Sequence, residues 1–237
     1  MSVIKFIRTS LAVLTLASAG LLSLNAEAAN NGGVSLGATR VIYPQGKTQV
    51  SLAVNNSDSK AVFLIQSWIQ NAQEAKSSDF VITPPLFVMK PKKENTLRIM
   101  YVGADNLPKD RESLFWVNVK AIPSASKDTQ NKNTLQIAVL SRIKLFVRPK
   151  NLPIAAVDAP ANLRFHVSGN TLTVKNPTPY YITLVQFHSG NATLPNTMVA
   201  PLSQVDIKLP ANAQGSITFQ TVNDYGANTP TQKAIME

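Results

Sequence analysis

Short runs of alternating apolar and polar residues recur along nearly the whole chain beyond its first 28 residues. The runs are rich in β-branched and aromatic residues, and turn-forming clusters of Asn, Asp, Ser, Gly and Pro separate them. They cover residues 34–42, 49–55, 61–69, 80–82, 96–101, 114–121, 134–147, 163–167, 171–175, 181–188, 204–208 and 215–222. No stretch keeps the period of about 3.6 residues that marks an amphipathic helix. The pattern predicts an all-β protein with the short, regularly spaced strands of β-sandwiches.

Three prolines interrupt the strand pattern between the run that ends at residue 147 and the run that begins at residue 163. They are Pro149, Pro153 and Pro160, and they predict a short linker. We therefore expect a first domain over residues 29–149 and a second over residues 150–237. Each length suits an immunoglobulin-like sandwich.

The first residues have the pattern of a secretory signal peptide. Lys5 and Arg8 precede an uncharged, mostly apolar run over residues 10–24, and residues 26–28 (Ala-Glu-Ala) form a small-residue cleavage site. The alternative is an uncleaved anchor helix, but the run is shorter than the roughly 20 residues that a span needs. We predict that residues 1–28 are removed as a signal peptide and that the mature chain is exported.

The composition excludes several kinds of chemistry. The 237 residues include no Cys and only two His, which excludes disulfide scaffolds, thiolate metal sites and Cys nucleophiles and disfavours His-based zinc sites and triads. The sequence contains no G-x-S-x-G, H-E-x-x-H or Gly-rich phosphate-binding motif, and no Ca²⁺ loop. We predict that the protein is not an enzyme and uses no cofactor and no metal.

The net charge of +10 indicates an anionic partner, which could be a nucleic acid, a membrane surface or a protein carboxylate. Removal of residues 1–28, which hold two basic residues and one acidic residue, leaves +9. Export separates the chain from nucleic acid, so we expect no nucleic-acid partner. Because no later segment is apolar enough to span a bilayer, we also expect no membrane insertion.

The run that begins at residue 134 and reaches Arg148 is unusually long for a strand. Leu135, Ile137 and Val139 begin one series of alternate apolar positions along it. At about 3.3 Å per residue, fifteen residues approach 50 Å. A long apolar strand at a sheet edge invites pairing with another chain, which would make it a β-augmentation site. The other interpretation is an ordinary central strand with one buried face, and the pattern alone leaves both open.

Eight segments have sequences more specific than a general strand pattern, namely residues 34–44, 83–87, 93–99, 110–116, 118–123, 141–149, 176–181 and 223–226. In this order they resemble a known family, the periplasmic pilus chaperones, and most closely the type 1 fimbrial chaperones. The loop over residues 121–133 is short and no cysteine pair is present, as in the short-loop branch of this family. The resemblance implies two immunoglobulin-like domains in an angled, boomerang-like arrangement with a cleft between them.

The resemblance also implies a function, which is donor-strand complementation. A pilin subunit is an incomplete sandwich, and the last strand of the first chaperone domain fills its gap with alternate apolar side chains. By position these side chains, which we call the plug residues, are Leu135, Ile137 and Val139. The implied partners are pilin subunits in the periplasm and an outer-membrane usher that receives them. Self-association of the free protein through the same exposed strand is a further expectation.

Five charged residues gain a role from the resemblance. Arg40 and Lys144, the anchor pair, would bind the C-terminal carboxylate of the pilin through charge-assisted hydrogen bonds. Glu112, Arg148 and Asp224, the ion network, would bridge the two domains. The alternative interpretation for all five is a set of unrelated surface charges.

A second hypothesis assigns the chain to another class, a secreted two-domain structural or adhesive subunit of a surface fibre. Such a subunit should carry its own donor segment at its N-terminus. Residues 29–33 are only a small polar stub, which disfavours this alternative.

Overall fold

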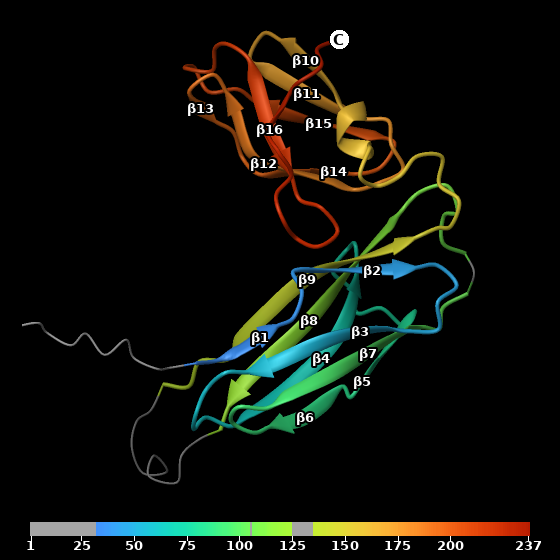
Figure 1. Ribbon diagram of the computed structural model, residues 1–237, viewed down its shortest axis with the longest axis vertical. Coiled ribbons are helices and arrows are strands. Elements are labelled where there is room, and N and C mark those ends of the chain that lie inside the picture. Colours follow the sequence, from blue (N-terminus) through green and yellow to red (C-terminus); the bar gives the residue numbers. More distant parts are fainter. Residues whose placement is uncertain (1–31, 105, 125–134) are drawn as a thin grey trace, which may run out of the picture. The chain divides into compact units, whose positions relative to one another are not determined.

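The computed structural model describes residues 32–104, 106–124 and 135–237. The expected signal peptide and most of the loop over residues 121–133 lie outside the described residues. The described chain is built from strands in two successive sandwiches, with one short 3-10 helix, η2 (Ala159–Asn162), before the second (Figure 1). The predicted all-β class is confirmed. No helix of the described segments has the length and apolar character to cross a membrane.

The first sandwich consists of a sheet in the order β1-β3-β7-β5 and a sheet in the order β2-β9-β8-β4-β6. Its strands are β1 (Val34–Leu36), β2 (Arg40–Pro44), β3 (Val50–Asn56), β4 (Phe63–Asn71), β5 (Phe80–Thr83), β6 (Leu86–Met89), β7 (Glu94–Tyr101), β8 (Ser113–Pro123) and β9 (Val139–Arg148). Neighbouring strands pair antiparallel, except for β2 and β9, which run parallel.

The second sandwich consists of a sheet in the order β10-β11-β15 and a sheet in the order β13-β12-β16-β17, in which β14 also pairs with β12. Its strands are β10 (Arg164–Ser168), β11 (Thr171–Asn176), β12 (Ile182–Ser189), β13 (Ala192–Thr193), β14 (Thr197–Val199), β15 (Ser203–Lys208), β16 (Ile217–Thr221) and β17 (Gln232–Lys233). The four strands that the sequence pattern did not predict, β6, β13, β14 and β17, have two to four residues each. Runs of that length carry too little alternation to be recognised.

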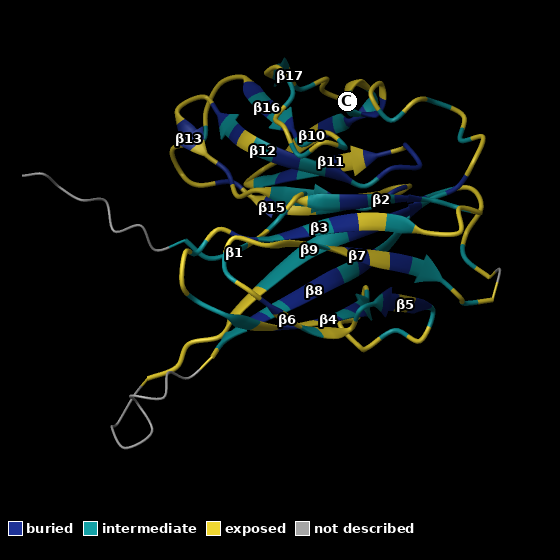
Figure 2. Ribbon diagram, turned by 60° about the horizontal axis from the view of Figure 1, so that its bottom comes forward, coloured by how far each residue is buried: buried dark blue, intermediate teal, exposed yellow. Residues whose placement is uncertain are grey.

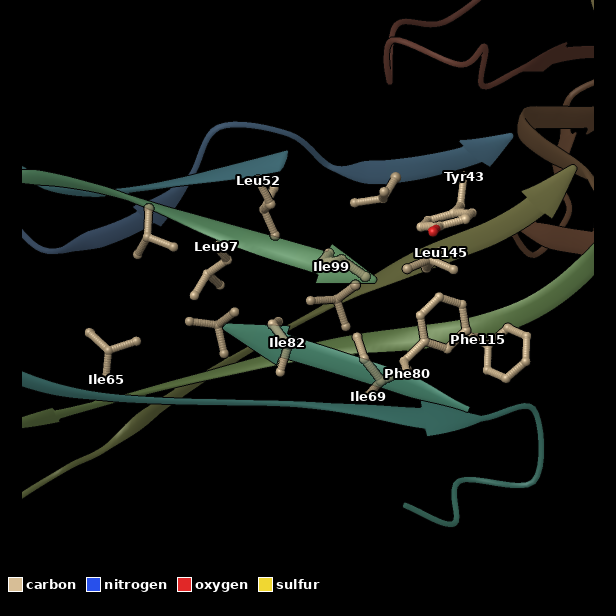
Figure 3. Packing of buried hydrophobic residues seen from close by; sticks show 14 of the residues in the cluster. Tyr43, Leu52, Ile65, Ile69, Phe80, Ile82, Leu97, Ile99, Phe115 and Leu145 are labelled. Carbon is tan, nitrogen blue, oxygen red and sulfur yellow. The ribbon is translucent and has the colours of Figure 1, made fainter. Parts of the chain in front are cut away.

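The core of the first sandwich follows from the alternating pattern. One face of each strand points inward, so that Leu52, Ile65, Leu97 and Leu145 are almost fully buried between the sheets (Figure 3). Each buried aliphatic side chain contributes on the order of 1.5–3 kcal/mol. Phe80, a member of this core, packs edge-to-face against the rings of Tyr43 and Phe115. A separate cluster of buried side chains forms the core of the second sandwich.

The expectation of one continuous strand over residues 34–42 is wrong, because the chain changes sheets within it. β1 pairs with β3, and β2 pairs with β9 in the opposite sheet. Gly37 lies at the crossing, where its amide donates to the carbonyl of Ala53 at 2.9 Å. A side chain at this position would press on the Ala53 methyl group, which explains the glycine. The change of sheet brings Arg40 to the start of β2, beside β9.

Candidate functional site

Strand β9 begins later than the sequence pattern predicts. The expected strand over residues 134–147 starts only at Val139, and residues 135–138 are not part of a strand. Its pairing with β8 ends where Ala121 lies opposite Val139. Pro123 follows on β8 and has no amide hydrogen to extend the ladder. The Gln136 side chain instead donates to the carbonyl of Pro123 at 2.7 Å.

The two halves of β9 have different neighbours. Residues 144–148, the paired half, lie between β8 and the parallel strand β2. Among the described residues, the open half of the strand, residues 139–143, pairs with β8 alone, because β2 begins only at Arg40, opposite Lys144. β9 is therefore a central strand at one end and an edge strand at the other.

Large apolar side chains just before the open half and at its start face solvent. The exposed fractions are 87% for Leu135, 66% for Ile137, 58% for Val139 and 50% for Leu140. In Figure 2 the colour changes from exposed yellow in this segment to buried blue along β9. A contiguous row of exposed large apolar side chains beside an unpaired strand edge is unusual in a monomer and marks an interaction surface.

The two cations of the anchor pair are direct neighbours in the β2–β9 ladder. Arg40 lies opposite Lys144, and both side chains are half-buried. Burial lowers the pKa of the Lys144 ammonium below its ordinary 10.5, and the charge of Arg40 lowers it further. Burial also lowers the pKa of Arg40. Two like charges held together in partial burial repel each other, and a bound anion would relieve that repulsion.

Acceptors from the second sandwich hold these two cations. Arg40 Nη1 donates to the carbonyl of Val222 at 3.1 Å, and Lys144 Nζ donates to the hydroxyl of Thr183 at 3.3 Å. Arg40 Nε is buried and has no hydrogen-bond partner within the described part of the chain. An oxygen-rich ligand would satisfy this donor, whose burial without a partner is otherwise unfavourable.

The three residues of the ion network form one connected group. Arg148 donates from Nε to Glu112 at 2.8 Å and from both terminal nitrogens to Asp224, each at 2.7 Å. Glu112 also accepts from the amide of Tyr181 at 2.8 Å. Burial raises the pKa of Glu112, and the bonds to Arg148 and Tyr181 act against that rise. Residues of both sandwiches thus share one hydrogen-bonded cluster.

A cavity of about 360 Å³ adjoins this cluster. Its lining includes Arg40, Arg148, Phe146, Tyr181 and Asp224. The rings of Phe146 and Tyr181 stack with their centroids 5.4 Å apart, so an apolar wall stands beside the charged groups. Two guanidinium groups, which are donors suited to carboxylates, therefore line the cavity beside this apolar wall.

Comparison with known proteins gives the family. Residues 33–153 match the family described as "Pili and flagellar-assembly chaperone, PapD N-terminal domain", and residues 158–233 match "Pili assembly chaperone PapD, C-terminal domain". The chain belongs to the PapD family of pilus-assembly chaperones.

Individual relatives of this chaperone agree with the family. The chaperone protein FimC of Escherichia coli K12 is 53% identical over 205 residues, which are 86% of this chain and 85% of FimC. The periplasmic chaperone SfaE has a solved structure with 51% identity and a TM-score of 0.76, covering 86% of this chain and all of SfaE. The SafB chaperone, solved in complex with the Salmonella enterica SafA pilin, is 32% identical with a TM-score of 0.78, covering 86% of this chain and 96% of that one.

These relationships decide between the two functional classes. The chain is a non-enzymatic pilus-assembly chaperone of two immunoglobulin-like sandwiches, and its family forms complexes with pilin subunits, as SafB does. The fibre-subunit alternative is wrong, because both matching families are those of assembly chaperones.

Sequence reasoning missed Thr183 and the carbonyl of Val222, which hold the anchor pair. Thr183 lies in an ordinary strand pattern, and a main-chain carbonyl has no sequence signal. It also missed Arg142, which stacks over the ring of Trp116 at 4.2 Å and pairs with Glu74 at 2.9 Å. Within the described residues, no three His, Asp or Glu side chains are grouped to hold a metal ion.

Proposed function

We propose that this chaperone acts in the periplasm, binds pilin subunits by donor-strand complementation and delivers them to an outer-membrane usher. One observation supports this most strongly. The exposed plug residues lead into the open half of β9, and the same strand then reaches Lys144, which lies opposite Arg40 of β2. A pilin subunit is an incomplete sandwich, and its binding requires three features. These are an unpaired strand edge, exposed apolar side chains and a site for the C-terminal carboxylate.

In the proposed complex a pilin strand pairs with the free edge of residues 139–143. Leu135, Ile137 and Val139 then enter the core of the pilin, since side chains at alternate positions of a strand share a face. Their present exposure makes them available without rearrangement of the first sandwich. Burial of each side chain contributes on the order of 1.5–3 kcal/mol.

The anchor pair sets the register of that pairing. Arg40 offers a planar fork of donors and Lys144 a mobile ammonium, which together suit the two oxygens of a C-terminal carboxylate. A slip of one residue would turn every plug side chain to the opposite face. A fixed end point for the pilin strand therefore decides which side chains enter its core.

The proposed role of Glu112, Arg148 and Asp224 is to fix the relation between the two sandwiches. Replacing a buried ionic network by apolar residues often costs little stability, so its value lies in geometry. Here the network connects β9, which carries Lys144, to the segments that supply the acceptors for the anchor pair.

Export and self-association complete the proposal. Residues 1–28 direct the chain to the periplasm and are removed there, which leaves domains over residues 29–149 and 150–237. The relation to the periplasmic chaperone SfaE supports this compartment. In the absence of pilin, the exposed edge of β9 pairs with a second copy, since an apolar edge is a liability when bare.

Co-expression tests the proposal. The chain is produced in the periplasm together with candidate pilin subunits. The amount of pilin that becomes soluble and co-purifies is then measured. Three proteins are compared, namely the wild type, Lys144→Ala and Lys208→Ala. Lys208 is an exposed lysine of β15 and serves as the matched control. We expect Lys144→Ala to lose at least tenfold of the captured pilin while Lys208→Ala retains it.

A thermal melt confirms that each variant is folded. Normal pilin capture by folded Lys144→Ala would refute the carboxylate anchor. Failure of the wild type to solubilise any pilin encoded near it would refute the subunit-binding function itself.

A further inference from the structure

Thr183 contacts the anchor pair from the second sandwich. It is the second residue of β12, and its hydroxyl accepts the hydrogen bond from Lys144 Nζ at 3.3 Å. The threonine is half-buried. A single hydroxyl of the second sandwich thus meets the cation that the first sandwich supplies.

The position of Thr183 is fixed on several sides. Its carbonyl accepts from the amide of Val222 at 3.2 Å, and the carbonyl of Val222 in turn accepts from Arg40 Nη1. Two residues before Thr183, the amide of Tyr181 donates to Glu112. The acceptors for Lys144 and Arg40 are therefore linked to each other by a hydrogen bond, and the chain just before Thr183 is bound to the ion network.

A lysine needs such a contact more than an arginine does. Its ammonium lies at the end of a flexible four-carbon chain, and the charge of Arg40 pushes it away. The hydroxyl oxygen of Thr183 offsets part of that repulsion and selects one position for the ammonium. Because the oxygen accepts from Lys144, the hydroxyl hydrogen points elsewhere and can donate to a carboxylate oxygen.

We propose that Thr183 is a positioning residue of the anchor pair, whose hydroxyl holds the Lys144 ammonium ready for a carboxylate. The assignment rests on the proposed function as far as the carboxylate is concerned. The contact between Thr183 and Lys144 can be tested without any partner. The second sandwich then takes a direct part in recognition.

The first measurement uses the free protein. The rate at which acetic acid N-hydroxysuccinimide ester modifies Lys144 is followed by mass spectrometry in the wild type, Thr183→Val and Thr183→Ser. Valine removes the hydroxyl at nearly equal volume, and serine retains it. We expect a several-fold faster reaction at Lys144 in Thr183→Val only, because loss of the acceptor leaves more of the amine neutral. The rate at Lys208 serves as the internal reference and should not change.

The second measurement is capture of the pilin that the wild type solubilises. We expect Thr183→Val to reduce capture about tenfold, as loss of a hydrogen bond to a charged group does, and Thr183→Ser to restore it. In a Lys144→Ala background, Thr183→Val should have no further effect, since it acts through the ammonium.

The two measurements separate the possible failures. Equal modification of Lys144 in the wild type and Thr183→Val would overturn the positioning role, whatever the capture shows. A loss of capture of the same size with and without Lys144 would also overturn it, because the threonine would then act by another route. If Lys144→Ala captures pilin normally, the carboxylate anchor fails, whereas the contact is still judged by the modification rate.

Discussion

The two halves of β9 belong to one strand and differ in almost every physical property. In the paired half, Leu145 and Val147 are buried in the core of the first sandwich, and β8 and β2 satisfy the backbone on both sides. In the open half, at least half of the Val139 and Leu140 side chains is exposed, and β8 is the one strand of the described chain that pairs with it. The boundary between the two halves lies at Lys144, which is opposite Arg40, the first residue of β2.

The comparison shows how one strand can serve stability and binding together. The paired half gains its burial within the chain, so it contributes to folding. In the open half the apolar side chains stay exposed, and the backbone groups on one edge are not paired with a described strand. Both are therefore available to a partner. The same contrast predicts that substitutions in the two halves have separable effects.

The largest effect on stability is expected in the paired half. Leu145→Ala should lower the free energy of unfolding by about 3–5 kcal/mol, since it removes a fully buried side chain and leaves a cavity. Leu140→Ala in the open half, the matched control, should change it by less than about 0.5 kcal/mol. Urea unfolding followed by tryptophan fluorescence measures both. Equal destabilisation by the two variants would remove the contrast.

The next effect concerns Arg148, which ends the paired half. Glu112→Ala should cost about 3 kcal/mol, because it removes one acceptor of the Arg148 guanidinium and leaves the amide of Tyr181 unpaired in a buried site. Asp110→Ala, which removes an exposed carboxylate paired with the adjacent Arg111, is the control and should leave the unfolding midpoint unchanged. Small-angle scattering should also show an altered radius of gyration for Glu112→Ala alone.

A smaller free-energy effect, on binding only, is expected at the plug residues. Ile137→Asp should reduce pilin capture about 10- to 100-fold, the equivalent of losing the burial of one large aliphatic side chain. Its melting temperature should stay that of the wild type, because Ile137 makes no core contact. Leu202→Asp, at a leucine of the second sandwich that is about half exposed, controls for the added charge. Unchanged capture by Ile137→Asp would point to a different binding surface.

The smallest effect is the dependence of binding on pH. A carboxylate binds the charged ammonium, and burial together with Arg40 lowers the pKa of Lys144 below 10.5. Affinity is therefore complete below that lowered pKa and falls as the pH rises through it, by a factor of about two at the pKa itself. Isothermal titration calorimetry between neutral and alkaline pH measures this. Lys144→Arg, which keeps its charge throughout the range, should abolish the fall.

Much of the fold could be predicted from local pattern. The runs over residues 61–69, 114–121 and 171–175 agree with β4, β8 and β11 within two residues at each end. The central positions on one face of these strands are buried, so their alternation is regular. The prediction of strands failed where the pairing between strands, rather than the alternation of side chains, decides where a strand begins or ends. Residues 135–138 alternate like a strand but lie outside β9, and the run over residues 34–42 is split between two sheets.

The candidate site divides in the same way. Arg40 and Lys144 could be named from the sequence because they stand in segments that resemble the pilus chaperones, and the plug residues could be named from their position just before one of these segments. Thr183 and the carbonyl of Val222 could not, because nothing in their local sequence distinguishes them from other strand residues. Their importance arises only from the cations that they meet, which are 39 and 182 residues away along the chain.

The sequence by itself determined the all-β class, the identity of most strands and the set of charged and apolar residues that carry the proposed function. These properties depend on side-chain alternation and on residue type, which are local. Only the tertiary structure decided where β9 changes from an edge to a centre and which groups hold Arg40 and Lys144. Both depend on which distant strand comes to lie alongside, and that is set by the packing of whole sheets rather than by any one segment.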